Sequence, residues 1–206
     1  MEERETMVRE QIAARGITDS RVLLALRALP RHEFVPPHLA AEAYADRPLC
    51  IGAGQTISQP YIVAAMTDVL GLRGAERVLE VGTGSGYQAA VLATLARDVR
   101  TLEIVPELAD LARVTLARLG FANARVCAGD AWTECTEGAP FDAILVAAAP
   151  EEVPAPLIDA LRVGGRMVLP IGGREQQLVV IDKHEHGCTR TVLFPVRFVP
   201  MTGGKR

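Results

Sequence analysis

Apolar runs and helix-forming segments alternate along this chain from residue 77 onward. Runs of about four to eight apolar residues between turn signals predict strands, and apolar residues repeating every three or four positions predict helices. The pattern predicts strands at 77–81, 99–104, 124–128, 142–147, 166–170, 176–182 and 189–195, with helices at 86–96, 106–118 and 154–161. Alternation of this kind is typical of a mostly parallel sheet with helices on both faces.

The last two predicted strands are separated only by residues 183–187. So short a connection suits antiparallel strands, since a parallel crossover needs about a dozen residues or more. We therefore expect an antiparallel hairpin at one edge, in whose turn His184 and His186 are solvated side chains rather than metal ligands. The expected fold class is α/β: a doubly wound, mostly parallel, Rossmann-like sheet with helices on both faces.

Three further helices are predicted before the sheet, at 3–15, 19–29 and 61–70. Thr18 or Asp19 can cap the start of the second of them, because both side chains can accept a hydrogen bond from a backbone N–H of the first turn. We expect the first two of these helices to form an N-terminal cap over the sheet.

Residues 31–59 are rich in proline and lack a clear periodicity. A stretch of about 25 residues without secondary structure inside a compact domain usually forms a functional loop. The stretch leads into a polar run from Gly52 to Pro60. Within it, Ser58 can cap the following helix, which has Pro60 in its first turn, or can take part in chemistry, and both interpretations stay open.

The length of 206 residues suits a single α/β domain over 1–206, with the cap and loop in 1–76 and the core in 77–206. The net charge of −3 is spread without long runs and argues against a nucleic-acid partner. We expect no membrane span and no secretory signal, because there is no apolar run of about 18 residues and the start is acidic. Scattered cysteines without a C-x-x-C pair indicate reduced thiols and a cytoplasmic protein.

The strand at 77–81 runs into three glycines at alternate positions, Gly82, Gly84 and Gly86, and then into a helix. Glycine permits a positive φ and lets a ligand approach the main chain without an intervening Cβ. The start of the helix adds N–H groups that point at such a ligand. A dinucleotide site has the wider G-x-G-x-x-G spacing, so this tighter one favours a ligand without a pyrophosphate.

Three acids stand near the ends of successive predicted strands: Glu80, Glu103 and Asp130. A carboxylate at Glu103 can accept hydrogen bonds from both ribose hydroxyls, and one at Asp130 can bind an adenine amino group. Together the acids suit adenosine joined to a cationic group. S-adenosylmethionine, with a sulfonium, an ammonium and no phosphate, is such a ligand, so the pattern favours a class I methyltransferase.

From about Val22 to Thr202, the sequence resembles the protein-L-isoaspartate (D-aspartate) O-methyltransferases. The most specific segment is the Gly-Gln-Thr-Ile-Ser-Gln-Pro run at 54–60, because general methyltransferases share the glycine turn but not this loop. The other matching segments are Arg31-x-x-Phe34-Val35-Pro36, 78–88, Gly129-Asp130, 141–144, 156–166, 169–172 and 196–200. The resemblance implies a Rossmann-like methyltransferase sheet with an N-terminal helical cap and a C-terminal antiparallel edge hairpin.

The resemblance also implies a reaction and its residues. A methyl group passes from S-adenosyl-L-methionine to the free carboxylate of L-isoaspartyl residues in damaged proteins, with D-aspartyl residues as a further candidate acceptor, and the ester then closes to a succinimide. Ser58 is the implied catalytic residue, and Thr56, Ile57 and Val199 are implied substrate contacts. The implied cofactor contacts are Glu80, Gly82, Thr83, Gly84, Ser85, Gly86, Glu103, Gly129 and Asp130. We expect no metal and a monomer.

This chemistry needs no general base, because an aspartyl-type carboxyl group, with a pKa of about 4, is already ionised at neutral pH. Ser58 is then expected to donate a hydrogen bond that orients the carboxylate. Three alternatives stay open: a methyltransferase with another acceptor, such as a different carboxylate or a nucleic-acid base; a nicotinamide-dependent oxidoreductase; and a binding module for damaged peptides. Residues 196–202 form either an ordinary last strand or an edge that binds an extended peptide.

Overall fold

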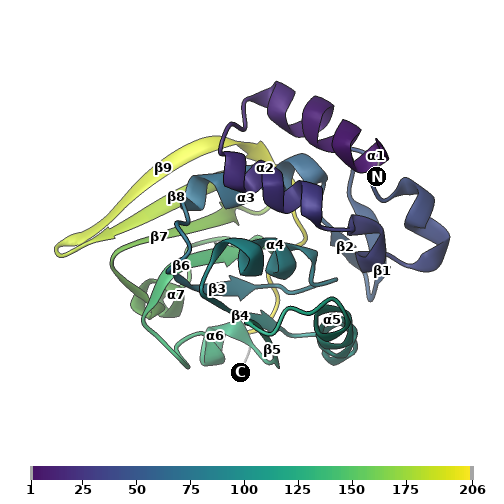
Figure 1. Cartoon of the computed structure of the whole chain (residues 1–206). Coiled ribbons are helices and arrows are strands. Elements are labelled where there is room, and N and C mark those ends of the chain that lie inside the picture. Colours follow the sequence, from purple (N-terminus) through teal and green to yellow (C-terminus); the bar gives the residue numbers. More distant parts are fainter. Residues whose placement is uncertain (1, 205–206) are drawn as a thin grey trace.

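A computed structural model describes residues 2–204 of the chain, and its centre is a seven-stranded sheet (Figure 1). The strand order is β5-β4-β3-β6-β7-β8-β9. The strands are β3 (Arg77–Val81), β4 (Asp98–Glu103), β5 (Ala124–Ala128), β6 (Phe141–Val146), β7 (Leu161–Ile171), β8 (Gln176–His184) and β9 (Gly187–Val196). The five strands from β5 to β7 in this order pair in parallel, whereas β7, β8 and β9 pair antiparallel. The predicted sheet and edge hairpin are therefore confirmed.

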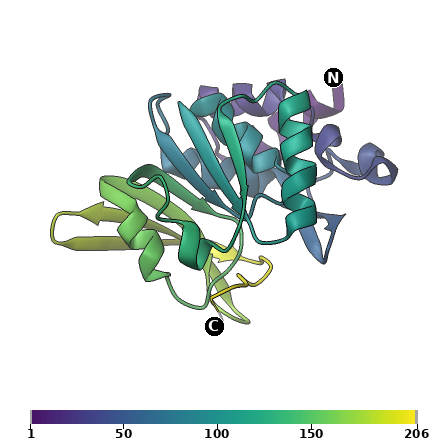
Figure 2. The same ribbon diagram turned by 90° about the horizontal axis from the view of Figure 1, so that it is seen from below.

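Helices cover both faces of the sheet (Figures 1 and 2). On one face, α3 (Pro60–Leu70), α4 (Tyr87–Leu95) and α5 (Pro106–Arg118) pack on alternate strand residues such as Val78 and Val99. On the other, the short helices α6 (Ala131–Glu134) and α7 (Ala155–Ala160) pack on the residues between them, such as Leu79 and Leu102. Because both faces of the strands are buried, the strands contain apolar runs rather than a strict alternation.

Two predictions about this part of the chain need correction. Helix α6 was not predicted, since Asp130 was expected only in a turn. The helix predicted at 154–161 ends at Ala160, because Leu161 already pairs with Phe141 and begins β7.

The N-terminal cap is made of α1 (Glu2–Thr6), a π-helix (Met7–Ile12), a 3-10 turn (Ala13–Arg15) and α2 (Ser20–Ala28). The predicted helix at 3–15 is therefore one helical segment whose hydrogen-bond spacing changes along its length. Asp19, and not Thr18, caps α2: its carboxylate accepts a hydrogen bond of 2.8 Å from the Arg21 N–H. The cap buries Met7, Val8 and Ile12 against α3 and α4.

The stretch at 31–59 is not structureless, so that expectation was wrong. It forms two 3-10 helices, Arg31–Phe34 and Pro37–Glu42, and a hairpin of β1 (Leu49–Gly52) and β2 (Gln55–Ile57). Each 3-10 helix follows a proline whose carbonyl accepts a short-range hydrogen bond. Elements this short have no periodicity that a sequence pattern can reveal.

Three polar side chains form a buried chain where β3 and β4 meet. Thr101 Oγ1 donates to Glu80 Oε2 over 2.5 Å, and Thr83 Oγ1 lies 2.6 Å from Thr101 Oγ1. Either threonine hydroxyl can be the donor of the second bond. The other oxygen of Glu80 has no hydrogen-bond partner among the described residues. Burial raises the pKa of Glu80 to about 8, so this carboxyl group is mostly protonated at neutral pH.

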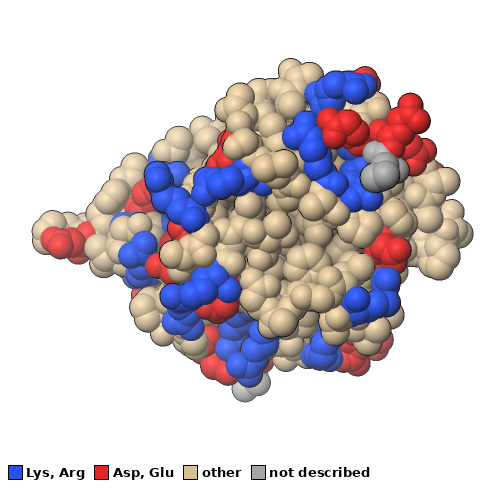
Figure 3. Space-filling view, viewed as in Figure 1, with Lys and Arg blue, Asp and Glu red and all other residues tan. Residues whose placement is uncertain are grey.

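On the face drawn in Figure 3, Lys and Arg side chains alternate with Asp and Glu around an uncharged centre, so that face carries no continuous basic surface. Within residues 2–204, no helix is long and apolar enough to cross a membrane.

The core predicts a contrast between two Leu→Ala substitutions. Leu79 of β3 is fully buried on the face of the sheet that α6 and α7 cover, so Leu79→Ala should lower the free energy of unfolding by about 2–5 kcal/mol. Leu24 is 61% exposed, so Leu24→Ala should change it by no more than about 0.5 kcal/mol. Urea denaturation of both variants measures the difference, and equal losses would contradict this placement of the core.

The raised pKa of Glu80 predicts a dependence of stability on pH. The folded protein keeps the Glu80 proton up to about pH 8, whereas the unfolded chain releases it near 4.5. The contribution of the Glu80 proton to the free energy of unfolding is therefore full below pH 4.5 and is lost as the pH rises through 8. We expect Glu80→Gln to lose less stability than the wild type between about pH 5 and pH 8. Urea titrations at several pH values test this, with the exposed Glu107→Gln as a control that keeps the wild-type slope.

Candidate active site

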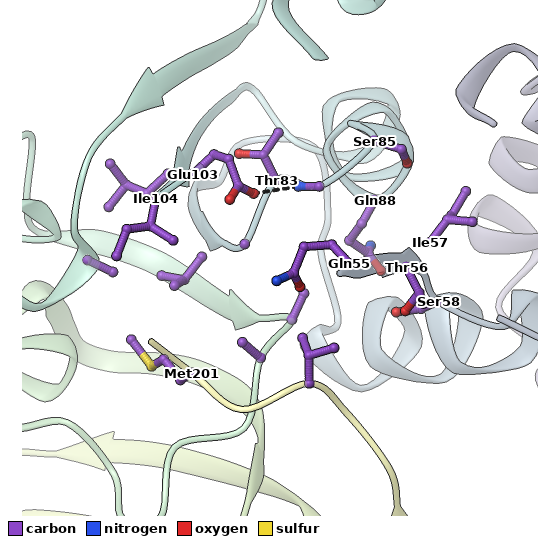
Figure 4. A pocket seen from close by; sticks show the side chains of 18 of the residues that line it. Gln55, Thr56, Ile57, Ser58, Thr83, Ser85, Gln88, Glu103, Ile104 and Met201 are labelled. Atoms are coloured by element: carbon purple, nitrogen blue, oxygen red, sulfur yellow. Dashed lines mark hydrogen bonds between the residues drawn. The ribbon is translucent and has the colours of Figure 1, made fainter. Parts of the chain in front are cut away.

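A cavity opens at the carboxyl ends of β3, β4 and β6, between the sheet and the β1–β2 hairpin (Figure 4). It holds about 850 Å³ of empty space, counting its open mouth. Parallel strands bring their carboxyl ends to the same edge of a sheet, so residues far apart in the sequence meet there. Of the residues predicted from the sequence, the following line the cavity: Thr56, Ile57, Ser58, Gly82, Thr83, Gly84, Ser85, Glu103, Gly129 and Val199.

The glycine turn, residues 82–86, forms one wall. Gly82 and Gly84 have φ of 89° and 52°, a region that side chains with a Cβ rarely adopt. The Gly82 N–H donates to the Leu102 carbonyl over 2.8 Å, which ties the turn to β4. A Cβ at Gly84 would lie 3.3 Å from Ile51 of the β1–β2 hairpin, so glycine also allows the hairpin to approach.

Glu103 at the end of β4 is the acid that faces the cavity. Its Oε2 accepts from the Gly84 N–H over 2.8 Å and its Oε1 accepts from the Val105 N–H over 3.0 Å. The two bonds fix the carboxylate, which is only 5% exposed, and leave each oxygen with capacity for a further donor. This arrangement can accept the two hydroxyls of a ribose.

Three predicted cofactor contacts do not line the cavity. Glu80 lies in the buried chain with Thr101 and so acts behind the wall rather than on it. Gly86 faces α5, since a Cβ there would lie 3.3 Å from Ala112. The Asp130 carboxylate accepts two backbone hydrogen bonds: one of 2.9 Å from the Trp132 N–H, which caps α6, and one of 2.9 Å from the Gly204 N–H. These three residues therefore do not line the cavity, and their contact with a cofactor stays a prediction.

The polar loop, residues 52–60, forms the opposite wall (Figure 4). Ile57 is buried and anchors the loop in the core, while Thr56 and Ser58 line the cavity on either side of it. The interpretation of Ser58 as a helix cap is wrong: Gln59 occupies the N-cap position of α3, with no side-chain capping bond. The carbonyl oxygen of Ser58 accepts a bond of 2.7 Å from Arg31.

The segment after β9, residues 199–202, lines another side of the cavity. Residues 199–201 run beside the loop that follows β6, because the Ala149 N–H donates to the Val199 carbonyl and the Met201 N–H donates to the Ala149 carbonyl, each over 2.8 Å. The segment is therefore already paired on this side, and it brings Val199 to the cavity.

Sequence reasoning gave no site role to several lining residues: Gln55, Val63, Val81, Tyr87, Gln88, Leu102, Ile104, Ala131, Ala147 and Ala148. Three more, Pro200, Met201 and Thr202, belong to the segment 196–202, for which a peptide-binding edge was one of two interpretations. Two signals were available: Gln88 is polar among the alanines of α4, and Gln55 lies in the polar run at 54–60. The Gln88 amide donates to Thr67 over 2.9 Å, which holds the side chain at the cavity wall. The other residues are mostly apolar and look like ordinary core positions in the sequence.

The residues present fit S-adenosylmethionine. The fixed Glu103 carboxylate suits the ribose, the glycine turn leaves the main chain open to the ligand, and no ring of phosphate-binding N–H groups is needed. Within residues 2–204, no group of three or more His, Cys, Asp or Glu side chains is placed to hold a metal ion.

Comparison with known proteins agrees with this geometry. The family model of protein-L-isoaspartate (D-aspartate) O-methyltransferase matches residues 2–206. A protein-L-isoaspartate O-methyltransferase from Methanoculleus marisnigri is 55% identical over 202 residues, covering 98% of this chain and 92% of the relative. One from Gloeobacter violaceus is 50% identical, covering 97% of this chain and 98% of the relative.

Solved structures give the same result. One described as a protein-L-isoaspartate O-methyltransferase superposes with a TM-score of 0.88 at 28% identity, covering 97% of this chain and 66% of that one. Another, from Plasmodium falciparum and in complex with S-adenosyl-L-homocysteine, has a TM-score of 0.85 at 27% identity, covering 97% and 98%. The chain belongs to the protein-L-isoaspartate (D-aspartate) O-methyltransferase family.

Proposed function

We propose that the cavity binds S-adenosyl-L-methionine along the glycine turn and places an isoaspartyl carboxylate against Ser58. The protein is an S-adenosylmethionine-dependent protein carboxyl O-methyltransferase. The observation that carries the proposal is that the glycine turn with Glu103 and the polar loop with Ser58 form opposite walls of one cavity. One wall suits the nucleoside, and the other offers a hydroxyl to the acceptor.

In this proposal the two walls have separate tasks. Glu103 holds the ribose, and Gly82, Gly84 and Gly129 allow close approach of the main chain. Ser58 donates a hydrogen bond to one oxygen of the acceptor carboxylate, while Thr56 and Val199 border the path of the peptide. Glu80 supports the glycine turn through Thr101 and Thr83 rather than touching the cofactor.

The bound cofactor supplies a methyl group on a sulfonium, and the chain supplies orientation. An ionised carboxylate needs no base, which fits a lining that contains no histidine. Holding the carboxylate in line with the methyl group can contribute several kcal/mol, about 7 or more in favourable cases. The apolar lining from Val63, Leu102 and Ile104 reduces the water that competes with Ser58 for the carboxylate.

The acceptor in this proposal is an L-isoaspartyl residue of a damaged protein, and the methyl ester then closes to a succinimide without further help from the enzyme. An extended peptide can reach the cavity past the segment at 199–202. Use of D-aspartyl residues, action as a monomer and a cytoplasmic location stay predictions from the sequence.

Ser58→Ala should lower kcat for an isoaspartyl peptide by about tenfold to a thousandfold, because it removes one donor from the acceptor carboxylate. The Kd for S-adenosyl-L-homocysteine should stay near the wild-type value, since the hydroxyl faces the acceptor. A radiolabelled methyl-transfer assay with isothermal calorimetry measures both. The exposed Ser20→Ala is the matched control, and a Ser58→Ala variant with full turnover would remove Ser58 from the mechanism.

Glu103→Gln should weaken binding of S-adenosyl-L-homocysteine by about tenfold to a hundredfold, because the amide replaces one ribose acceptor by a donor. Calorimetry gives the Kd directly. Glu107→Gln changes an exposed glutamate in α5 and controls for the lost negative charge. Equal affinities in the wild type and Glu103→Gln would show that Glu103 does not hold the cofactor.

A further inference from the structure

The guanidinium of Arg31 is fully buried and has no carboxylate within ion-pair distance among the described residues. Its Nε donates to the Ala43 carbonyl over 2.7 Å, and one Nη donates to the Ser58 carbonyl over 2.7 Å. The other Nη has no hydrogen-bond partner among the described residues. The guanidinium carbon lies 4.9 Å from the centre of the Tyr87 ring.

A buried charge without a partner is costly, so an arginine with only a structural role is normally paired. Two carbonyl oxygens and an aromatic face offset only part of this cost for Arg31. Burial lowers its pKa to about 10, which still leaves it charged at neutral pH. Burial also raises the pKa of Tyr87 to about 12, so the phenol beside it is neutral.

Arg31 stands directly behind the wall that faces the acceptor. Arg31 contacts Ser58 and Tyr87, and both of these residues line the cavity. The acceptor at this wall is an anion, and its charge is attracted by a buried cation more strongly than it would be in water. S-adenosyl-L-homocysteine carries no sulfonium charge, so its affinity gives a separate measure of the cofactor side.

We propose that Arg31 is a positioning residue that fixes the Ser58 backbone and provides the buried positive charge by which the site selects a carboxylate over a neutral acceptor. This rests on the proposed function, since it assigns the acceptor to the Ser58 wall. During methyl transfer the carboxylate loses its charge, so the attraction is greater for the bound acceptor than for the transition state. The effect of Arg31 therefore falls mainly on KM for the peptide and less on kcat.

The test uses two peptides that differ only in the isoaspartyl side: the acid, as substrate, and its primary amide, as competitive inhibitor. In the wild type the amide should bind more weakly than the acid. Arg31→Gln should raise KM for the acid by about tenfold or more, narrow the preference for acid over amide, and leave the Kd for S-adenosyl-L-homocysteine within about threefold. The exposed Arg21→Gln should leave all three values unchanged.

Arg31→Lys keeps the test decisive if the Gln variant does not fold. A buried lysine loses its proton at lower pH than an exposed one, so the preference for the acid should fall between about pH 7 and pH 9 in Arg31→Lys and stay flat in the wild type. A flat profile in Arg31→Lys, an unchanged preference in Arg31→Gln, or a parallel loss of cofactor affinity would overturn the proposal. A wild type that does not methylate the acid peptide would instead overturn the proposed function.

Discussion

The hydrogen bond from the Gly84 N–H to the Glu103 carboxylate joins the two strand ends on which the cofactor side of the site depends. It can form because β3 and β4 pair in parallel with Val81 beside Leu102, which brings the glycine turn and the acid to the same height. The turn must then take a positive φ at Gly84, where a side chain would be strained and would press on Ile51. One short contact therefore links sheet register, backbone conformation and the orientation of a carboxylate.

The acceptor side is built from a different part of the chain. The polar loop belongs to the first 60 residues, and it reaches the cavity because Ile57 is anchored in the core shared by the cap and α4. Arg31 reinforces the loop from behind by donating to the Ser58 carbonyl. In the proposed function, the cofactor and the acceptor therefore meet at a boundary between the sheet and its cap, and both parts contribute to the lining of the cavity.

Much of the fold could be predicted, because a strand buried on both faces leaves an apolar run that turns and caps delimit. The bounds of β5 and α5 agree with the prediction. The glycine turn follows the end of β3 and Glu103 lies at the end of β4, as predicted, and both line the cavity. The prediction failed for 31–59, where 3-10 helices and a hairpin are too short to show a period. Asp130 does not line the cavity, because its carboxylate is held by backbone N–H groups of α6 and of Gly204, and its contact with the cofactor stays a prediction.

Some assignments of site residues depended on the direction in which a side chain points, which the sequence does not give. Glu80 and Glu103 are both strand acids, yet Glu80 points into the core beside Thr101 and Glu103 faces the cavity. Alternate residues of a strand point to opposite faces, but which neighbours lie on each face is set by packing. By itself, the sequence determined the alternating elements, the glycine turn and the polar run that carry the family. Only the tertiary structure decided which acids line the cavity and that Arg31, without an ion-pair partner in residues 2–204, stands behind Ser58, because these follow from contacts between residues far apart in the chain.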